Sequence, residues 1–167
     1  MADSSAAGAA VGGPLNITDH QEIMDLIHRY SYSYDEAKDP DAWGSLFLEN
    51  ATWSAYEPNS SVPVMLTKSN EERRRGAEQR LRLMGNQGVQ TRHYTTDTLL
   101  KKAGEGRVEG ITMVLVAWQY ASEASPRLMH TGYYRDEFAK TEHGWRFASR
   151  EAHMDQASGQ AKDKWIP

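Results

Sequence analysis

The sequence contains no cysteine among its 167 residues. A disulfide framework, a thiolate metal site and a cysteine nucleophile are therefore excluded. The chain also lacks the Gly-x-Gly-x-x-Gly, P-loop and Gly-x-Ser-x-Gly patterns, in which glycines cradle phosphates or expose a nucleophilic serine. These absences argue against a nucleotide cofactor and against serine-hydrolase chemistry, and we expect a protein that uses no cofactor.

Long apolar runs and an excess of positive charge are also missing. The longest apolar run, ITMVLVAW at 111–118, is far shorter than the roughly 20 residues that a membrane-spanning helix needs. The net charge is −4, from 19 basic and 23 acidic residues. The basic run at 73–75 is flanked by Glu71, Glu72 and Glu78, as on a solvated helix face. We expect a cytoplasmic protein that binds neither nucleic acid nor a membrane.

The length of the chain fits one domain of ordinary size. Residues 1–16 are rich in small side chains and lack a basic start, which predicts a disordered leader rather than a secretory signal. Residues 156–167 are mostly polar and predict a C-terminal tail. A single domain is then expected over residues 17–155.

Helical periodicity opens this domain. Thr18 and Gln21 form a capping-box pattern, which predicts a helix over about 19–35. One stripe of that helix is apolar and consists of Ile23, Leu26, Ile27, Tyr30 and Tyr34. Asp39 followed by Pro40 predicts the start of a second helix. The apolar face of the second helix is expected to consist of Trp43, Leu46 and Phe47.

A third helix is predicted after a short strand and a loop. The strand is expected at 51–56 and the loop at 57–68, where two prolines occur. Ser69 and Glu72 form a second capping box and predict a polar helix that ends near Met84. Its buried line is expected to consist of Ala77, Leu81 and Met84.

The second half of the domain has the alternation of β-strands. Four segments, at 91–103, 108–122, 127–141 and 145–155, are separated by turn residues and predict an antiparallel meander. Helices segregated from such a sheet indicate an α+β domain. The sheet must curl around the three helices to bury both apolar sets, and the curled sheet then encloses a cavity for a small molecule. Because segment 108–122 is apolar on both faces, we expect a second copy to cover the outer face in a homodimer.

Two residues are the main candidates for chemistry. Asp35 follows Tyr34 at the end of the first helix, where the helix dipole disfavours a carboxylate. It is either solvated in a turn or directed into the cavity. His93 lies on an alternating strand, on the face expected to carry Thr95, Asp97 and Leu99. If that face is concave, the imidazole enters the cavity and can exchange a proton near neutral pH.

Other side chains are expected to bind the substrate. The phenols of Tyr30 and Tyr34 are candidate catalytic donors to a substrate oxygen. The expected cavity wall consists of Trp53, Tyr56, Met65, Leu66, Met84, Trp118, Thr131, Tyr133 and Arg150. His93, His130 and His153 have no spacing typical of metal ligands, and we expect no metal site.

Four segments carry a resemblance to a known family: IMDLIHRYSYSYDEAKDPDAWGSLF, TRHYTTDT, HTGYYRDEF and GWRFASRE. From about Ile17 to Asp155 the chain resembles the nuclear-transport-factor-2-like superfamily. Within it, the chain is most similar to the polyketide-cyclase-like (SnoaL-like) and scytalone-dehydratase-like group. The resemblance implies a cone of curved antiparallel sheet closed by three helices.

The resemblance also implies roles for single residues. Tyr34 and Asp35 match the Tyr-Asp that closes the first helix in scytalone dehydratase, and His93 matches its cavity histidine. In that enzyme the two act as a pair, in which the aspartate orients and charges the histidine. Thr131 takes the place of a serine and Tyr133 that of an asparagine. One departure is Trp118, which stands where the dehydratase has a second cavity histidine.

Together these features predict a cofactor-independent lyase or isomerase of secondary metabolism. A dehydratase, a double-bond isomerase or a cyclase would use the Asp35–His93 pair on a polyketide, terpenoid or steroid. Two alternatives stay open. The chain could be a non-catalytic assembly module, like the small subunits of ring-hydroxylating dioxygenases that share this fold. It could also be an epoxide hydrolase or cyclase, for which Asp35 and Arg150 are available but no second cavity carboxylate is evident.

Overall fold

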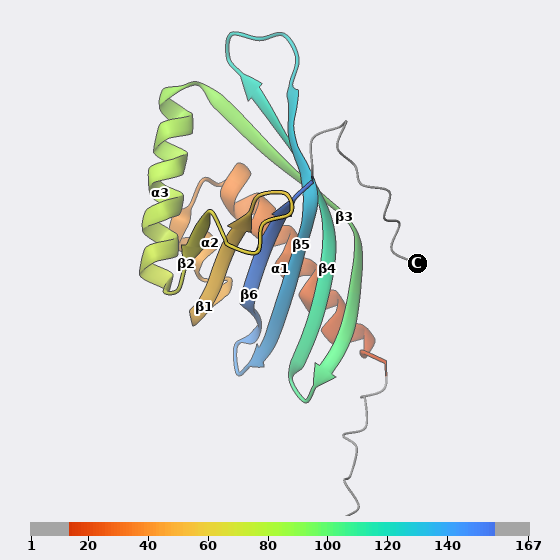
Figure 1. Ribbon diagram of the computed structural model, residues 1–167. Coiled ribbons are helices and arrows are strands. Elements are labelled where there is room, and N and C mark those ends of the chain that lie inside the picture. Colours follow the sequence, from red (N-terminus) through yellow and green to blue (C-terminus); the bar gives the residue numbers. More distant parts are fainter. Residues whose placement is uncertain (1–13, 156–167) are drawn as a thin grey trace, which may run out of the picture.

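The computed structural model describes residues 14–155 of the chain (Figure 1). Most of the expected leader and all of the expected tail therefore lie outside the described residues. In chain order the elements are α1 (Ile17–Asp35), α2 (Pro40–Gly44), β1 (Phe47–Tyr56), β2 (Met65–Thr67), α3 (Asn70–Asn86), β3 (Val89–Gly104), β4 (Arg107–Tyr120), β5 (Arg127–Thr141) and β6 (Gly144–Met154).

The six strands form one curved sheet that does not close on itself. Their order is β2-β1-β6-β5-β4-β3, so that β3 to β6 form the predicted antiparallel meander, while β1 pairs in parallel with β6. Helix α1 lies across one face of the sheet, and α3 stands beside the edge formed by β2 and β1 (Figure 1). The predicted α+β fold, a curved sheet with N-terminal helices, is confirmed.

The core lies between α1 and the concave face of the sheet. Ile23 and Ile27 of α1, together with Phe138 of β5 and Phe147 of β6, are fully buried in one cluster. Burial of such side chains contributes roughly 1.5–3 kcal/mol each. The predicted stripe of α1 therefore anchors the helix, and with it the position of Asp35 at its C-terminal end.

The helix starts differ in part from the sequence prediction. Helix α1 is capped by Asn16, whose side chain accepts a hydrogen bond from the backbone N–H of Asp19 at 2.8 Å, and the predicted Thr18–Gln21 box is wrong. Ser69 caps α3 as predicted, by accepting from the N–H of Glu72 at 3.2 Å. The Glu72 carboxylate, however, accepts from the N–H of Lys68.

The bounds of two elements and the burial on α3 also differ from the prediction. Helix α2 ends at Gly44, so Leu46 lies beyond it and Phe47 already begins β1. Within the predicted loop 57–68, residues Met65–Thr67 form β2 and pair with β1. On α3, Leu81 is only half-buried, while Arg73 takes a fully buried place on the inward stripe.

A bulge interrupts the alternation of β3. Asp97 has a positive φ of 52°, and the register with β4 shifts between Thr96 and Leu99. A shift of one residue moves every later side chain to the other face. The expectation that Leu99 shares a face with His93 is therefore wrong, because Leu99 is 72% exposed while Leu100 packs against the core.

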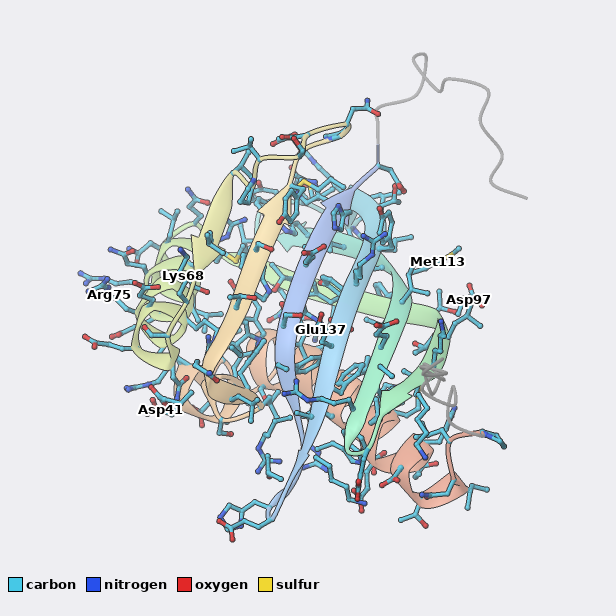
Figure 2. All side chains as sticks on the ribbon, turned by 60° about the horizontal axis from the view of Figure 1, so that its bottom comes forward. Asp41, Lys68, Arg75, Asp97, Met113 and Glu137 are labelled. Carbon is cyan, nitrogen blue, oxygen red and sulfur yellow. The ribbon has the colours of Figure 1, made fainter. Side chains whose placement is uncertain are left out.

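The outer, convex face of the sheet is open to solvent in a single chain. Met113 on β4 is 57% exposed and projects away from the sheet (Figure 2). Leu115 on the same strand is exposed as well, and so are Tyr94 on β3 and Leu128 on β5. Within residues 14–155, no helix combines the length and the apolar character needed to cross a membrane.

Candidate active site

The carboxylate of Asp35 and the imidazole of His93 meet at the wall of the cavity. His93 Nδ1 lies 2.8 Å from Asp35 Oδ1 and 3.0 Å from Oδ2. The backbone N–H of His93 donates to Oδ2 at 2.6 Å, and the Thr91 hydroxyl donates to Oδ1 at 2.7 Å. Both the side chain and the main chain of β3 thus hold this carboxylate, which is 4% exposed.

The end of α1 is fastened to β3 at the same place. Asp35 is the last residue of α1, and its carbonyl oxygen accepts a hydrogen bond from the Gln90 side-chain amide at 2.7 Å. The helix dipole disfavours a carboxylate here, but the hydrogen bonds from Thr91 and His93 offset that cost. Of the two alternatives that the sequence leaves open, the structure therefore selects the inward one.

The local electrostatics keep Asp35 ionised. Burial alone would raise the pKa of this carboxyl group. The hydrogen bond and the charge of the His93 ring, with the Thr91 hydroxyl and the His93 N–H, outweigh burial and lower the pKa below its ordinary value. An ionised Asp35 favours a proton on His93 Nδ1, which leaves Nε2 as the atom that can accept one.

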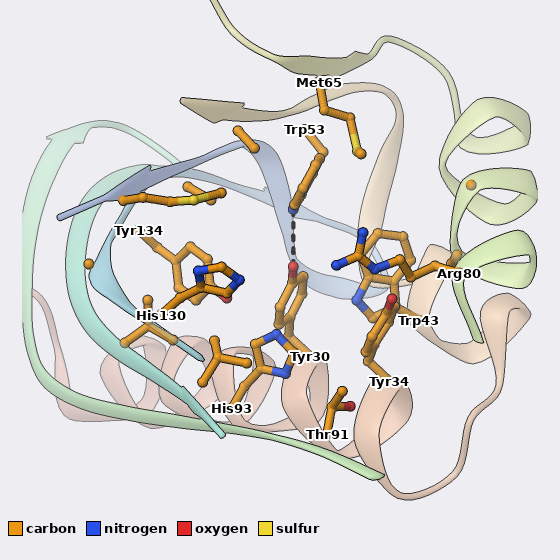
Figure 3. A pocket seen from close by; sticks show the side chains of 18 of the residues that line it. Tyr30, Tyr34, Trp43, Trp53, Met65, Arg80, Thr91, His93, His130 and Tyr134 are labelled. Carbon is orange, nitrogen blue, oxygen red and sulfur yellow. Dashed lines mark hydrogen bonds between the residues drawn. The ribbon is translucent and has the colours of Figure 1, made fainter. Parts of the chain in front are cut away.

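A cavity of about 770 Å³ lies on the concave side of the sheet, bounded by α1, α3 and the strands. His93 lines it together with six further predicted residues: Tyr30, Tyr34, Trp53, Met84, Trp118 and Thr131. Met65, also expected in the wall, lines it too (Figure 3). Most of the remaining wall is apolar, as in sites for small organic ligands.

The two phenols in the cavity differ in what they can offer. The ring of Tyr34 stands edge-on to that of His93, with centroids 5.8 Å apart. Burial raises the pKa of the Tyr34 phenol, so it remains a proton donor at any working pH. The Tyr30 hydroxyl accepts a hydrogen bond from Trp53 Nε1 at 3.0 Å (Figure 3). Tyr34 is therefore the better placed donor beside His93.

Three of the residues expected in the wall lie elsewhere. Tyr56 and Tyr133 stack on the His153 ring, with centroid distances of 4.6 and 4.9 Å, and neither lines the cavity. On β5 the inward residues include Gly132 and Tyr134, so the odd-numbered Tyr133 points to the other face. Leu66 is exposed on β2 and does not line the cavity either.

Arg150 is the fourth correction, because it lies in the core rather than in the cavity wall. It is 0% exposed and donates two hydrogen bonds to Asp136, at 2.7 and 2.8 Å. Its guanidinium also lies 4.1–4.2 Å from the ring centroids of Tyr30, Tyr134 and Phe147. The predicted contact of Arg150 with a substrate is therefore wrong. Without it, the epoxide-opening alternative loses its arginine.

Two further basic residues line the cavity, and of these only Arg80 was not singled out by sequence reasoning. His130 on β5 points into the cavity (Figure 3), and Arg80 reaches it from α3. The pairing of β4 with β5 shifts at a bulge between Val116 and Ala117, just before His130 on β5. Simple alternation along the sequence therefore does not predict which face of the sheet His130 takes. For Arg80 the available signal was its spacing from Ala77 and Met84 on the inward stripe.

Within residues 14–155 no three His, Asp or Glu side chains come together as ligands for a metal ion. The cavity wall itself carries no Asp or Glu in this part of the chain. Its polar groups are instead imidazoles, phenols, hydroxyls and arginine. Such a set can bind oxygen atoms and exchange protons.

Comparisons with known proteins agree with this fold. A proposed scytalone dehydratase from Novosphingobium aromaticivorans is 22% identical, with a TM-score of 0.69 over 84% of this chain and 87% of that one. ActVI-ORFA from Streptomyces coelicolor is 16% identical, with a TM-score of 0.73 over 84% and 98%. The beta subunit of a proposed aromatic-ring-hydroxylating dioxygenase from N. aromaticivorans is 17% identical, with a TM-score of 0.69 over 83% and 90%.

At these identities the solved structures establish the fold and leave the reaction open. None of the curated proteins matches the sequence. The family model of the SnoaL-like domain matches residues 16–151, which include α1, the strand that carries His93 and nearly all of β6. The chain therefore belongs to the SnoaL-like family.

Proposed function

We propose that this protein is a cofactor-independent lyase or isomerase that acts on an apolar, oxygenated small molecule. The observation that carries the proposal is the contact of Asp35 with His93 Nδ1 at 2.8 Å, on an imidazole that lines a cavity of about 770 Å³. An aspartate in this place fixes the tautomer of the ring and stabilises the imidazolium form. His93 is then a general base whose reactive atom, Nε2, is the one not bound to Asp35.

The reaction begins with removal of a proton next to a carbonyl group. Nε2 of His93 takes the proton, the electron pair of the C–H bond forms an enolate, and Asp35 stabilises the imidazolium. The Tyr34 hydroxyl donates to the enolate oxygen; one such donor is worth about 2.7–4 kcal/mol at the oxyanion of a hydrolase.

The same imidazolium completes either outcome. In a dehydration, the enolate expels a hydroxyl group from the β-carbon, and the proton on Nε2 goes to that leaving group, which departs as water. In an isomerisation, the proton returns to a different carbon of the conjugated system. Neither route needs an oxidant, a reductant or a further reactant, since every proton and electron pair is accounted for.

The composition of the cavity wall supports a substrate whose skeleton is mostly apolar. Trp43, Trp53 and Trp118 contribute aromatic surface, and Val116 and Met84 contribute aliphatic surface. Aromatic side chains present large apolar faces for ring systems. Polyketide, terpenoid and steroid skeletons share that character.

The proposal is tested by exchange of hydrogen for deuterium in 1-tetralone, a ketone with slowly exchanging α-protons. In heavy water, the wild type should accelerate exchange, and His93→Gln should reduce the acceleration by about 10²–10⁴-fold, the usual contribution of a general base. His28→Gln, at an exposed histidine of α1, serves as the matched control and should behave as the wild type. Equal rates for wild type and His93→Gln would contradict the proposal.

A second candidate function is an assembly module, because the fold is shared with the beta subunit of a proposed ring-hydroxylating dioxygenase. Such a module needs no cavity chemistry and would act by binding a large catalytic subunit. The buried Asp35–His93 pair favours the enzyme, since a binding module has no use for an oriented imidazole in a cavity. Co-purification with an iron–sulfur subunit and an unchanged exchange rate would favour the module.

We also propose that a second copy of the chain covers the outer face of β4, as a homodimer. The exposed side chains of Met113 and Leu115 on this strand, with Tyr94 on β3 and Leu128 on β5, support the proposal, because soluble proteins seldom leave such a surface uncovered. Light scattering should give twice the mass of the chain for the wild type and one chain mass for Met113→Glu. A monomeric wild type would contradict it.

A further inference from the structure

Helix α3 turns an unusual stripe toward the rest of the molecule. Arg73, Ala77, Arg80 and Met84 follow each other at spacings of four, three and four residues, which puts them on one face. Ala77 and Met84 are buried, as an inward stripe requires. The other two positions hold arginines, and their surroundings differ.

Arg73 is held by backbone carbonyls of the protein itself. It is 1% exposed, and its guanidinium donates to the backbone carbonyls of Ala51, Leu48 and Glu49 in β1. It also lies over the ring of Phe47, 5.0 Å from the centroid. Arg73 therefore ties α3 to the sheet, and its charge is not available to a ligand.

Arg80 lies two helical turns further along and has no such partners. In the described part of the chain it forms no ion pair and no hydrogen bond with protein groups. Its guanidinium lies over the Trp118 ring, 6.0 Å from the centroid, and is directed into the cavity (Figure 3). The outward arginines of the same helix, such as Arg75, instead point into solvent (Figure 2).

The charge of Arg80 acts inside the cavity. It partly offsets the rise in pKa that burial imposes on the Tyr34 phenol, so its field reaches the donor beside His93. No Asp or Glu lines the cavity among the described residues, and Asp35 is engaged by His93. The cavity thus presents a cation without a counter-ion.

We propose that Arg80 and Trp118 form an anion subsite in this cavity, and that the substrate carries a carboxylate that binds there. The Trp118 ring lies 6.0 Å from the Arg80 guanidinium and gives the subsite an aromatic surface. An aromatic or alicyclic body can pack on Trp118 while Arg80 binds the carboxylate through two parallel N–H donors.

This subsite narrows the class of substrate for the proposed reaction. The inference rests on the proposed function only for the part of the substrate that contacts His93. The substrate is then an apolar, oxygenated acid rather than a neutral polyketide, terpenoid or steroid. Its carboxylate lies at Arg80, and the carbon that loses a proton lies at His93. The arrangement fixes which way round the substrate enters.

The test is a calorimetric binding titration with two ligands of nearly equal shape, 2-naphthoate and 2-naphthamide. The wild type should bind the carboxylate about tenfold more tightly than the amide. Arg80→Gln should abolish that preference and leave the affinity for 2-naphthamide within about twofold. Arg75→Gln, which removes the same charge from the outer face of α3, should keep the preference.

Three results would overturn the subsite: no preference for the carboxylate in the wild type, including no binding of either ligand; an equal loss in Arg75→Gln and Arg80→Gln; or an Arg80→Gln variant that weakens both ligands alike. Binding is measured without turnover, so its outcome is separate from the exchange of 1-tetralone. His93→Gln should lose exchange and keep the preference for 2-naphthoate, whereas Arg80→Gln should lose the preference.

Discussion

Two buried aspartates of this protein each bind a basic side chain from a strand, yet the two pairs serve different ends. Asp136 and Arg150 join β5 to β6 inside the core, and both are fully buried. Asp35 and His93 join the end of α1 to β3, and the imidazole lines the cavity. The geometry of the two contacts is similar, with shortest distances of 2.7 and 2.8 Å.

The difference lies in the basic partner. Burial opposes the charge of Arg150, but the Asp136 carboxylate beside it raises the pKa of the guanidinium above its ordinary value, so this partner never releases a proton. An imidazole, unlike a guanidinium, can both accept and release a proton. On the proposed function, a buried aspartate becomes part of a reactive site when its partner can exchange a proton and has one edge open to a cavity.

The largest effect on stability is expected from breaking the core pair. Arg150→Met leaves Asp136 as a buried charge without its cation, and removal of one partner of a buried pair costs about 3–5 kcal/mol. Urea denaturation of the variant should show that loss in the free energy of unfolding. The double variant Arg150→Met with Asp136→Leu should recover most of it, because both charges are then gone. An Arg150→Met variant as stable as the wild type would show that the Asp136–Arg150 pair does not stabilise the fold.

A smaller effect is expected from weakening the site pair. Thr91→Val keeps the shape of the side chain but removes the hydroxyl that donates to Asp35 Oδ1. Loss of a donor to a buried charged group costs about 1–3 kcal/mol. The exchange rate should also fall, since Asp35 holds His93 less firmly. Thr98→Val, on the same strand but bonded to Thr112, should leave the rate unchanged.

The smallest effect is a dependence of stability on pH. The pKa of Asp35 is lower in the folded chain than its ordinary value of 3.8. Its ionised form therefore stabilises the fold at pH values above that ordinary value, and the contribution is lost as the pH falls through the lower, folded pKa. The difference in unfolding free energy between wild type and Asp35→Asn should therefore shrink as the pH falls below about 4. A difference that grows in acid would contradict the assigned direction.

Much of the fold was predictable because the apolar spacing is regular. Segment 127–141 matches β5 at both ends, and the stripe of α1 from Ile23 to Tyr30 is buried as predicted. Bulges in the strands limited how well the facing of single side chains could be predicted. Nothing in the alternating, threonine-rich sequence around Asp97 indicates its positive φ. The register shift that follows places Leu99 on the outer face.

Some residues of the candidate site could be predicted from the sequence and others could not. Asp35 and His93 could be paired through the family resemblance, since 58 positions separate them and spacing alone says nothing about their contact. Arg150 and Arg80 show the reverse problem, because an inward arginine can lie in the core or in a cavity. Which of the two applies depends on whether acceptor groups of the protein stand opposite, such as the carboxylate of Asp136 at Arg150, and a single sequence does not reveal that.

The most direct test of the central claim compares Asp35→Asn with Asp136→Asn in the same two measurements, exchange of 1-tetralone and thermal unfolding. Asp35→Asn should lose at least about a hundredfold in exchange rate while most of its stability remains, because the imidazole loses its orientation and its counter-charge. Asp136→Asn should unfold at a lower temperature and keep the exchange rate of its folded fraction. An Asp35→Asn variant with the exchange rate of the wild type would contradict the account.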